Sequence, residues 1–200
     1  MYLTCINWSV NLHPQDPFFF GYGSLVNRRT HVYGQARPAR AQGWRRIWRH
    51  TALRPVAILT AIPAPETEIE GLVAAVPGAD WAALDARECD YDRVLTFDIA
   101  HGLTPPPEVA IYTIPETKHP RAAEPTVILL SYLDVVVQGY LDEFGEAGVD
   151  RFFATTDGWD APILNDRAAP TYPRAQLLAP TETGLVDHYL KALGSEVRQG

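Results

Sequence analysis

Three consecutive aromatic residues, Phe18–Phe20, are followed at once by Gly21 and Gly23, which flank a tyrosine. An unbroken apolar run of this kind predicts a β-strand that is enclosed on both faces. The two glycines end the strand and allow the backbone to approach a bound group, so that successive N–H donors can point into a cavity. The stretch therefore predicts a loop that binds an anion or an oxyanion. The candidate binding residues are Tyr22, Gly23, Ser24 and Leu25.

The loop matches neither of two better known glycine motifs. A dinucleotide fingerprint would need a third glycine. A nucleophile elbow would need glycine two residues after Ser24, where this chain has Val26. An ordinary turn is the common alternative for a Gly-X-Gly-Ser string, so the interpretation depends on what the rest of the chain supplies.

The chain has the size of one domain, with 200 residues, 46% of them hydrophobic, and a net charge of −7. We expect an N-terminal arm over residues 1–16 and a single domain over 17–200, in which 146–200 form a covering extension. No apolar run approaches the roughly 20 residues of a membrane span. The cysteines, Cys5 and Cys89, make no disulfide framework, and a basic signal-peptide flank is missing, which favours a cytoplasmic location.

The predicted elements indicate an α+β fold with a mixed, partly closed sheet and helices outside it. Strands are expected at 56–62 and 69–76, which a turn at 63–67 would join into a hairpin, and at 94–100 and 109–114. Helices are expected from Asp80 onward, over 126–144 up to Gly145, around 149–154, and over 185–193.

The longest predicted helix is apolar almost all round, but its polar residues form one stripe at steps of three, four and four. A solvated face is the favoured interpretation, and a cavity lining is the alternative. The stripe consists of Ser131, Asp134, Gln138 and Asp142.

The Pro-rich segment 156–174 is expected to lie over the body and cover apolar surface.

Glu88 is the candidate for proton transfer. It shares a predicted helix face with Trp81 and Leu84, whereas Asp85 and Asp92 lie off that face. Burial would raise its pKa and make it usable as an acid and base near neutral pH. On the residues alone, a surface or ion-paired glutamate is the alternative.

Other sites find less support. The six histidines do not pair at metal-ligand spacing, so no metal is expected. A nucleophilic Ser24 would need a histidine base, and none is singled out. A rival function rests on residues 28–54, which contain eight arginines, Trp44 and Trp48, and no acid. Such a face could bind nucleic acid or another polyanion. We favour neutralisation by the acids of 66–98 and expect no nucleic-acid partner.

Three stretches resemble the gamma-glutamylcyclotransferase superfamily, which includes the ChaC-type enzymes that degrade glutathione. The first is Phe20–Leu25, the second consists of Leu84, Asp85, Glu88, Tyr91 and Arg93, and the third is Gly43–Arg46. The similarity as a whole extends over about residues 17–145. The resemblance implies a mixed-strand, partly closed barrel with flanking helices, no cofactor, and release of 5-oxoproline from a small gamma-glutamyl compound.

The implied chemistry needs no nucleophile from the protein, because the substrate's α-amine attacks its own γ-carbonyl carbon. Glu88 would take the proton from the α-ammonium and return it to the leaving amine. The amides of residues 22–25 would hold the α-carboxylate or the oxyanion. A non-catalytic binding protein of the same fold is the alternative. Glutathione, gamma-glutamyl dipeptides and gamma-glutamyl amines stay open as substrates, and so does the oligomeric state.

Overall fold

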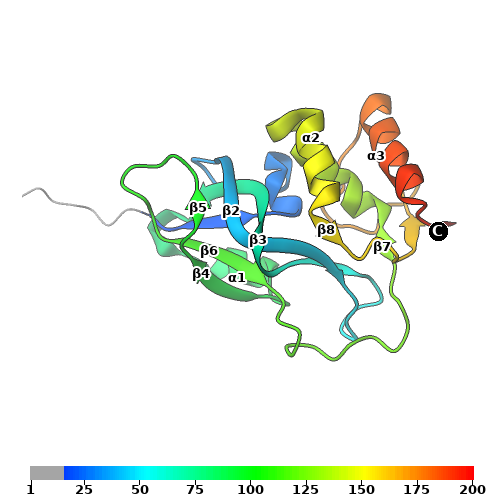
Figure 1. The fold of residues 1–200 in the computed structure, drawn as a ribbon, viewed down its shortest axis with the longest axis horizontal. Helices are drawn as coiled ribbons and strands as arrows, with labels where there is room; N and C mark the ends of the chain where they lie inside the picture. Colours follow the sequence, from blue (N-terminus) through cyan, green and yellow to red (C-terminus); the bar gives the residue numbers. More distant parts are fainter. Residues whose placement is uncertain (1–15) are drawn as a thin grey trace, which may run out of the picture.

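The computed structural model describes residues 16–200, which form a mixed sheet curled into a half-barrel with helices packed against it (Figure 1). The main sheet has the strand order β4-β6-β1-β3-β2-β5, and β8 pairs with β2. Its strands are β1 (Phe18–Gly21), β2 (Arg37–Arg49), β3 (Ile58–Ala75), β4 (Asp92–Thr96), β5 (Ile99–Ala100), β6 (Val109–Thr113) and β8 (Thr156–Asp157). A smaller sheet contains β7 (Ile128–Leu129), β9 (Ile163–Asn165) and β10 (Val197–Gln199).

Three α-helices flank the sheets, and α2 and α3 lie side by side (Figure 1). The predicted fold class is therefore confirmed. The arm predicted over residues 1–16 lies outside the described residues, apart from residue 16, and so does Cys5. No helix within residues 16–200 is long and apolar enough to cross a membrane. The helices are α1 (Ala82–Arg87), α2 (Leu130–Ala154) and α3 (Pro180–Leu193), with short 3-10 turns η1 (Ser24–Val26), η2 (Arg28–Thr30) and η3 (Pro77–Ala79).

β1 is an interior strand of the main sheet and carries the loop. It pairs antiparallel with β3 and parallel with β6, and all four of its residues are buried. Phe18 and Phe20 join the large core that includes α2, whereas Phe19 packs with Leu84 of α1 in a second cluster. The predicted strand with two covered faces is confirmed, and it ends at Gly21, where the loop begins.

The hairpin predicted between residues 56 and 76 is wrong. β3 is one continuous strand, and its residues 58–63 and 68–73 both pair with β2 rather than with each other. Pro63 pairs with Trp44 of β2, whereas Pro65 lies in a bulge of residues 64–67, where the register between β2 and β3 shifts. Both prolines lie outside residues 72–75, the part of β3 that pairs with β1. Proline is tolerated in a strand where one edge needs no ladder hydrogen bond, and this explains why the strand continues.

The long helix begins later than predicted, at Leu130, because residues 128–129 belong to β7. The predicted break at Gly145 is confirmed, since this residue leaves helical geometry (φ 65°, ψ −171°). The predicted short helix around 149–154 is also present, as the second part of α2.

Three of the four residues in the polar stripe of α2 lie neither on a solvated face nor along an open cavity. Ser131, Asp134 and Gln138 are all buried. The C-terminal segment covers them: Ser131 Oγ donates to Asp166 (2.6 Å), and Arg167 pairs with both oxygens of Asp134 (2.7 and 2.8 Å). The prediction of a solvated face is therefore wrong for these three residues, because polar partners from a distant part of the chain satisfy their side chains. It is right for Asp142, the fourth residue of the stripe, whose side chain is exposed and pairs with Arg29.

Candidate active site

The predicted site residues come together at one hollow of the molecule. Residues 20–25 and Glu88 line a small cavity of about 30 Å³, with Tyr91, Tyr112 and Tyr132 as its aromatic walls. A larger cavity of about 360 Å³ shares Ser24 and Glu88 with it. The two cavities therefore form one site, and a volume of a few hundred Å³ suits a small-molecule ligand.

The glycine loop lines this site and includes backbone amides without a partner among the described residues. The amides of Gly23 and Leu25 form no hydrogen bond with any atom of residues 16–200, whereas the next turn is closed by Val26, whose amide donates to the Gly23 carbonyl (3.0 Å). A β-carbon on Gly23 would lie 2.7 Å from the Tyr132 hydroxyl oxygen, so a side chain there would collide with the wall. Unpartnered amides beside a cavity are suited to binding an anionic group.

Tyr22 lines the small cavity and also anchors the loop in the core. Its hydroxyl donates to the Tyr112 carbonyl oxygen (2.5 Å). The Tyr140 hydroxyl lies 2.9 Å from the Tyr22 carbonyl oxygen and 2.7 Å from that of Glu70, and with one proton it donates to one of them at a time. Both ends of Tyr22 are thus held by buried hydrogen bonds.

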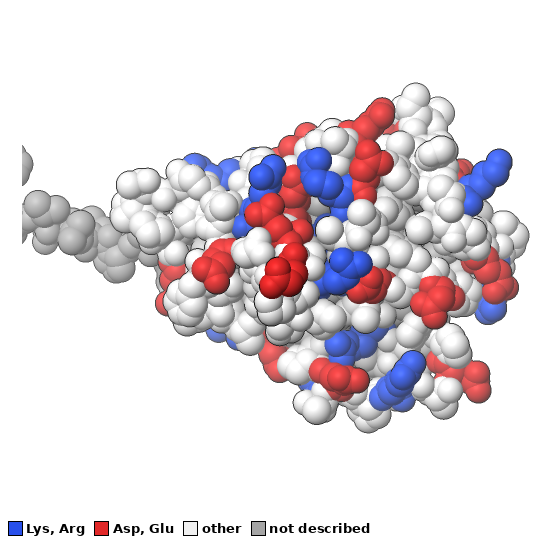
Figure 2. Space-filling model, viewed as in Figure 1, with Lys and Arg blue, Asp and Glu red and all other residues white. Residues whose placement is uncertain are grey.

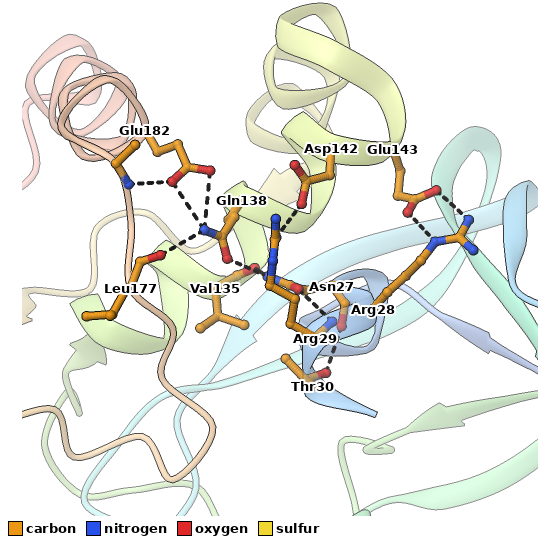
Figure 3. Close-up of polar contacts among 11 residues, drawn as sticks. Asn27, Arg28, Arg29, Thr30, Val135, Gln138, Asp142, Glu143, Leu177 and Glu182 are labelled. Carbon is orange, nitrogen blue, oxygen red and sulfur yellow. Dashed lines mark hydrogen bonds and ion pairs between the residues drawn. The ribbon is translucent and has the colours of Figure 1, made fainter. Parts of the chain in front are cut away.

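A second anchor joins the turn after the loop to α2 and to the C-terminal segment (Figure 3). Asn27 donates from Nδ2 to the Val135 carbonyl (3.0 Å) and to Gln138 Oε1 (2.9 Å). Gln138 in turn donates to the Leu177 carbonyl and to Glu182 (both 3.2 Å). Because Glu182 belongs to α3, this network fixes the position of the loop relative to both α2 and α3.

Glu88 directly follows α1, and its side chain is only 15% exposed. Burial raises the pKa of its carboxyl above the ordinary value of 4.5, although the charge of Arg87 and the hydrogen bond that Arg87 donates both act to lower it. Glu88 is both largely buried and ion-paired, because the Arg87 Nε donates to Oε1 (2.9 Å). No hydrogen bond to Oε2 occurs within the described residues, so this oxygen is open to a bound molecule.

Arg87 is a site residue that the sequence analysis missed. Its guanidinium bridges Glu88 to the loop: it also donates to Ser24 Oγ (3.2 Å) and to the Thr30 carbonyl (2.8 Å). Ser24 therefore has an arginine as its hydrogen-bond partner and no histidine base, which argues against a nucleophilic serine. Its position next to Glu88 was the one sequence feature that could have identified Arg87, but the sequence does not show which way the Arg87 side chain points.

The two alternative carboxylates are already engaged. Asp85 accepts a hydrogen bond from the Tyr112 hydroxyl (2.6 Å) and pairs with Arg93 (3.2 Å). Asp92 pairs with Lys118. Neither of them lines the two cavities described above, so Glu88 is the carboxylate placed beside the loop.

The tyrosine walls supply neutral hydroxyls. Burial raises the pKa of Tyr91 and of Tyr132 well above the ordinary value of 10, so both stay protonated near neutral pH. The Tyr91 hydroxyl donates to the Leu59 carbonyl (2.8 Å), which orients this ring against β3. Tyr112 lies 24 residues beyond Glu88 on β6, and no sequence pattern singled it out.

The arginines of residues 28–54 are largely paired, but not as predicted. Arg40 and Arg54 form ion pairs with acids of residues 66–98. Arg28, Arg29 and Arg45 form ion pairs with acids of residues 142–157 instead, so the acids of 66–98 neutralise only part of this basic stretch. Figure 2 shows acidic and basic side chains interspersed on the face in view, without a broad basic surface. A mixed surface of this kind gives no support to polyanion binding.

No group of three or more His, Cys, Asp or Glu side chains within residues 16–200 is arranged to hold a metal ion. Cys89 is a free, exposed cysteine beside Glu88 in sequence, and it lines neither cavity.

Solved structures with a similar fold include that of the uncharacterized human protein loc79017, with 14% identity, a TM-score of 0.54, and coverage of 86% of this chain and 99% of that one. A structure named gamma-glutamyl cyclotransferase has 14% identity and a TM-score of 0.53, covering 87% of this chain and 99% of that one. YkqA from Bacillus subtilis has 18% identity and a TM-score of 0.52, covering 72% of this chain and 56% of that one. Identities this low establish similarity of fold.

A search of curated proteins finds no sequence match. The family model described as ChaC-like protein matches residues 18–130, which is more than half of the chain and includes β1, the loop and Glu88. This match supports an enzyme of the gamma-glutamyl cyclotransferase type. The chain therefore belongs to the ChaC-like family, within the gamma-glutamylcyclotransferase-like superfamily.

Proposed function

We propose that this protein is a cofactor-independent gamma-glutamyl cyclotransferase that releases 5-oxoproline from a small gamma-glutamyl compound. The observation that carries the proposal is a largely buried carboxylate, Glu88, which lines the same cavity as Gly23 and Leu25, whose amides are unpartnered among the described residues. The family assignment supports this reaction class.

In the proposed reaction, Glu88 removes a proton from the substrate's α-ammonium, and the freed amine attacks the γ-carbonyl carbon. A C–N bond forms to close the five-membered ring, and the C–N bond to the leaving amine breaks. Glu88 returns the proton to the leaving nitrogen, and the proton lost by the attacking nitrogen also ends on the released amine. No hydrolysis occurs, because the nucleophile belongs to the substrate.

The loop amides and the surrounding walls would position the substrate. The amides of Gly23 and Leu25 are suited to the α-carboxylate or to the oxyanion of the tetrahedral intermediate. Tyr132, packed against Gly23, would limit the room for the head group and exclude water from it. The open Oε2 of Glu88 is the atom that would exchange the proton.

The Arg87→Gln variant should shift the pH dependence of the reaction. The reaction requires ionised Glu88, so kcat/KM should fall as the pH drops through the pKa of this carboxyl. Arg87 lowers that pKa, and its removal should therefore move the acid limb to higher pH. The measurement is a pH profile of kcat/KM for both proteins. A variant with an unchanged acid limb, or one moved to lower pH, would contradict the assignment of this limb to Glu88.

The proposal is tested by incubating the protein with a gamma-glutamyl dipeptide, a gamma-glutamyl amine and glutathione. We expect 5-oxoproline from at least one of them, detected by mass spectrometry. Binding of these compounds without any 5-oxoproline would instead favour a non-catalytic binding protein of the same fold.

A further inference from the structure

The segment of residues 166–174, here called the strap, crosses the beginning of α2 and ends at the larger cavity. Its first residue, Asp166, accepts hydrogen bonds from the backbone amide (2.8 Å) and the hydroxyl (2.6 Å) of Ser131. Asp166 also accepts from the Thr171 amide (2.8 Å), which closes the strap into a compact loop. This part of the chain lies beyond residues 18–130, which the family model matches.

Two further contacts fix the strap. Arg167 makes a two-pronged ion pair with Asp134 of α2 and a second pair with Asp187 of α3 (2.7 Å). The ring of Tyr172 packs edge-on against Tyr132, with 5.0 Å between the ring centroids. Because Tyr132 is also a wall of the glycine-loop cavity, the strap is held in a defined position beside the site.

The strap brings Arg174 to the cavity. Three guanidiniums line the larger cavity, and two of them are engaged by the protein itself. Arg87 bonds Glu88, and Arg54 pairs with Asp90. The guanidinium of Arg174 makes no hydrogen bond or ion pair within residues 16–200, and the residue is partly buried. It is the guanidinium of this cavity that is left to receive a ligand.

The net charge of the residues that line the larger cavity also favours the binding of one anionic group. Its lining carries three positive charges from arginines and two negative charges, from Glu88 and Asp90, when both carboxylates are ionised. The gamma-glutamyl head group is a zwitterion, so its ammonium and carboxylate cancel. One positive charge then remains for the other half of the substrate, and a guanidinium is well matched to a carboxylate.

We propose that Arg174 is a specificity-determining residue that binds a carboxylate on the leaving half of the substrate. This inference rests on the proposed function. The protein then prefers gamma-glutamyl amino acids or peptides to gamma-glutamyl amines, which lack this carboxylate. The strap acts as the support that positions Arg174, and the glycine loop reads the head group that all these compounds share.

The test uses two substrates that differ by one carboxylate, gamma-glutamylalanine and gamma-glutamylethylamide. Release of 5-oxoproline is measured for the parent protein and for Arg174→Gln, at a pH where Glu88 is ionised in both. The parent should favour the alanine compound by about 10- to 100-fold in kcat/KM, as expected for a charge-assisted hydrogen bond. Arg174→Gln should lose most of that preference through a higher KM for the alanine compound, and Arg174→Lys should restore part of it. Arg121→Gln, which removes an exposed arginine outside both cavities, is the matched control.

The outcomes separate this inference from the proposed function. If Arg174→Gln lowers kcat/KM equally for both compounds, Arg174 acts through the charge of Glu88, and the inference is overturned. If the parent releases no 5-oxoproline from either compound, the proposed function fails. Calorimetry on the Glu88→Gln protein then decides the inference alone: tighter binding of the alanine compound that depends on Arg174 supports it, and equal binding of both compounds overturns it.

Discussion

The Glu88→Gln variant should fold normally, bind substrate and lose roughly two to four powers of ten in turnover, which is the usual contribution of a general acid and base. Glutamine keeps the shape of the side chain and an acceptor for the Arg87 hydrogen bond, but it cannot exchange a proton. Burial raises the pKa of Glu88 toward the range where a carboxyl both accepts and returns a proton, so the loss should fall on kcat more than on KM. Steady-state kinetics of 5-oxoproline release measures it.

Cys89→Ser is the matched control for this variant, because it changes the next residue in the chain. Cys89 is exposed and lines neither cavity, and the proposed reaction uses no thiol. The serine variant should keep the parent turnover. A Glu88→Gln protein as active as the parent, or a comparable loss in Cys89→Ser, would remove Glu88 from its proposed role.

Gly139→Ala should destabilise the fold and disturb the site at the same time. A β-carbon at residue 139 of α2 would lie 2.7–2.9 Å from the backbone amide nitrogen, Cα and Cβ of Asn27. The added methyl must push apart α2 and the turn after the glycine loop, and it strains the hydrogen bonds from Asn27 to Val135 and Gln138. Overpacking of this kind costs about 1–3 kcal/mol, which outweighs the gain of about 1 kcal/mol that alanine normally brings to a helix.

Gly184→Ala supplies the control within α3. A β-carbon there meets no atom within 4 Å, so only the helix preference for alanine should act. Thermal or urea unfolding should therefore give opposite signs, with Gly139→Ala less stable and Gly184→Ala equally or more stable than the parent. If both variants were stabilised, the close contact between α2 and Asn27 would not exist as described.

The parts of the fold that local pattern controls were predictable from the sequence. The aromatic run Phe18–Phe20 has no polar residue to expose, so it specified a strand covered on both faces, and Gly145 marked the break in α2. The loop and Glu88 could be chosen as candidates because a glycine pair and an acid after a short helix are local features. Their meeting in one cavity depends on β1 and α1 packing on each other, as Phe19 and Leu84 do.

The errors have a common physical origin in contacts between distant segments. Proline at residues 63 and 65 suggested a turn, but β2 pairs with β3 on both sides of the bulge at residues 64–67, so the chain continues along the same neighbour. The polar stripe of α2 resembles a solvated face until the strap and α3 supply its partners. Arg87 and Arg174 could not be recognised either, because the direction of a long side chain and the ion pairs that engage its neighbours are properties of the folded chain.

The most direct test of the proposed reaction is a quantitative analysis of products from gamma-glutamylalanine. The protein should release 5-oxoproline and free alanine in equal amounts, without glutamate, because the substrate's own amine closes the ring and water takes no part in the bond cleavage. Glu88→Gln should form both products at least about a hundred times more slowly. Glutamate in place of 5-oxoproline, or equal rates for the two proteins, would contradict cyclisation assisted by Glu88.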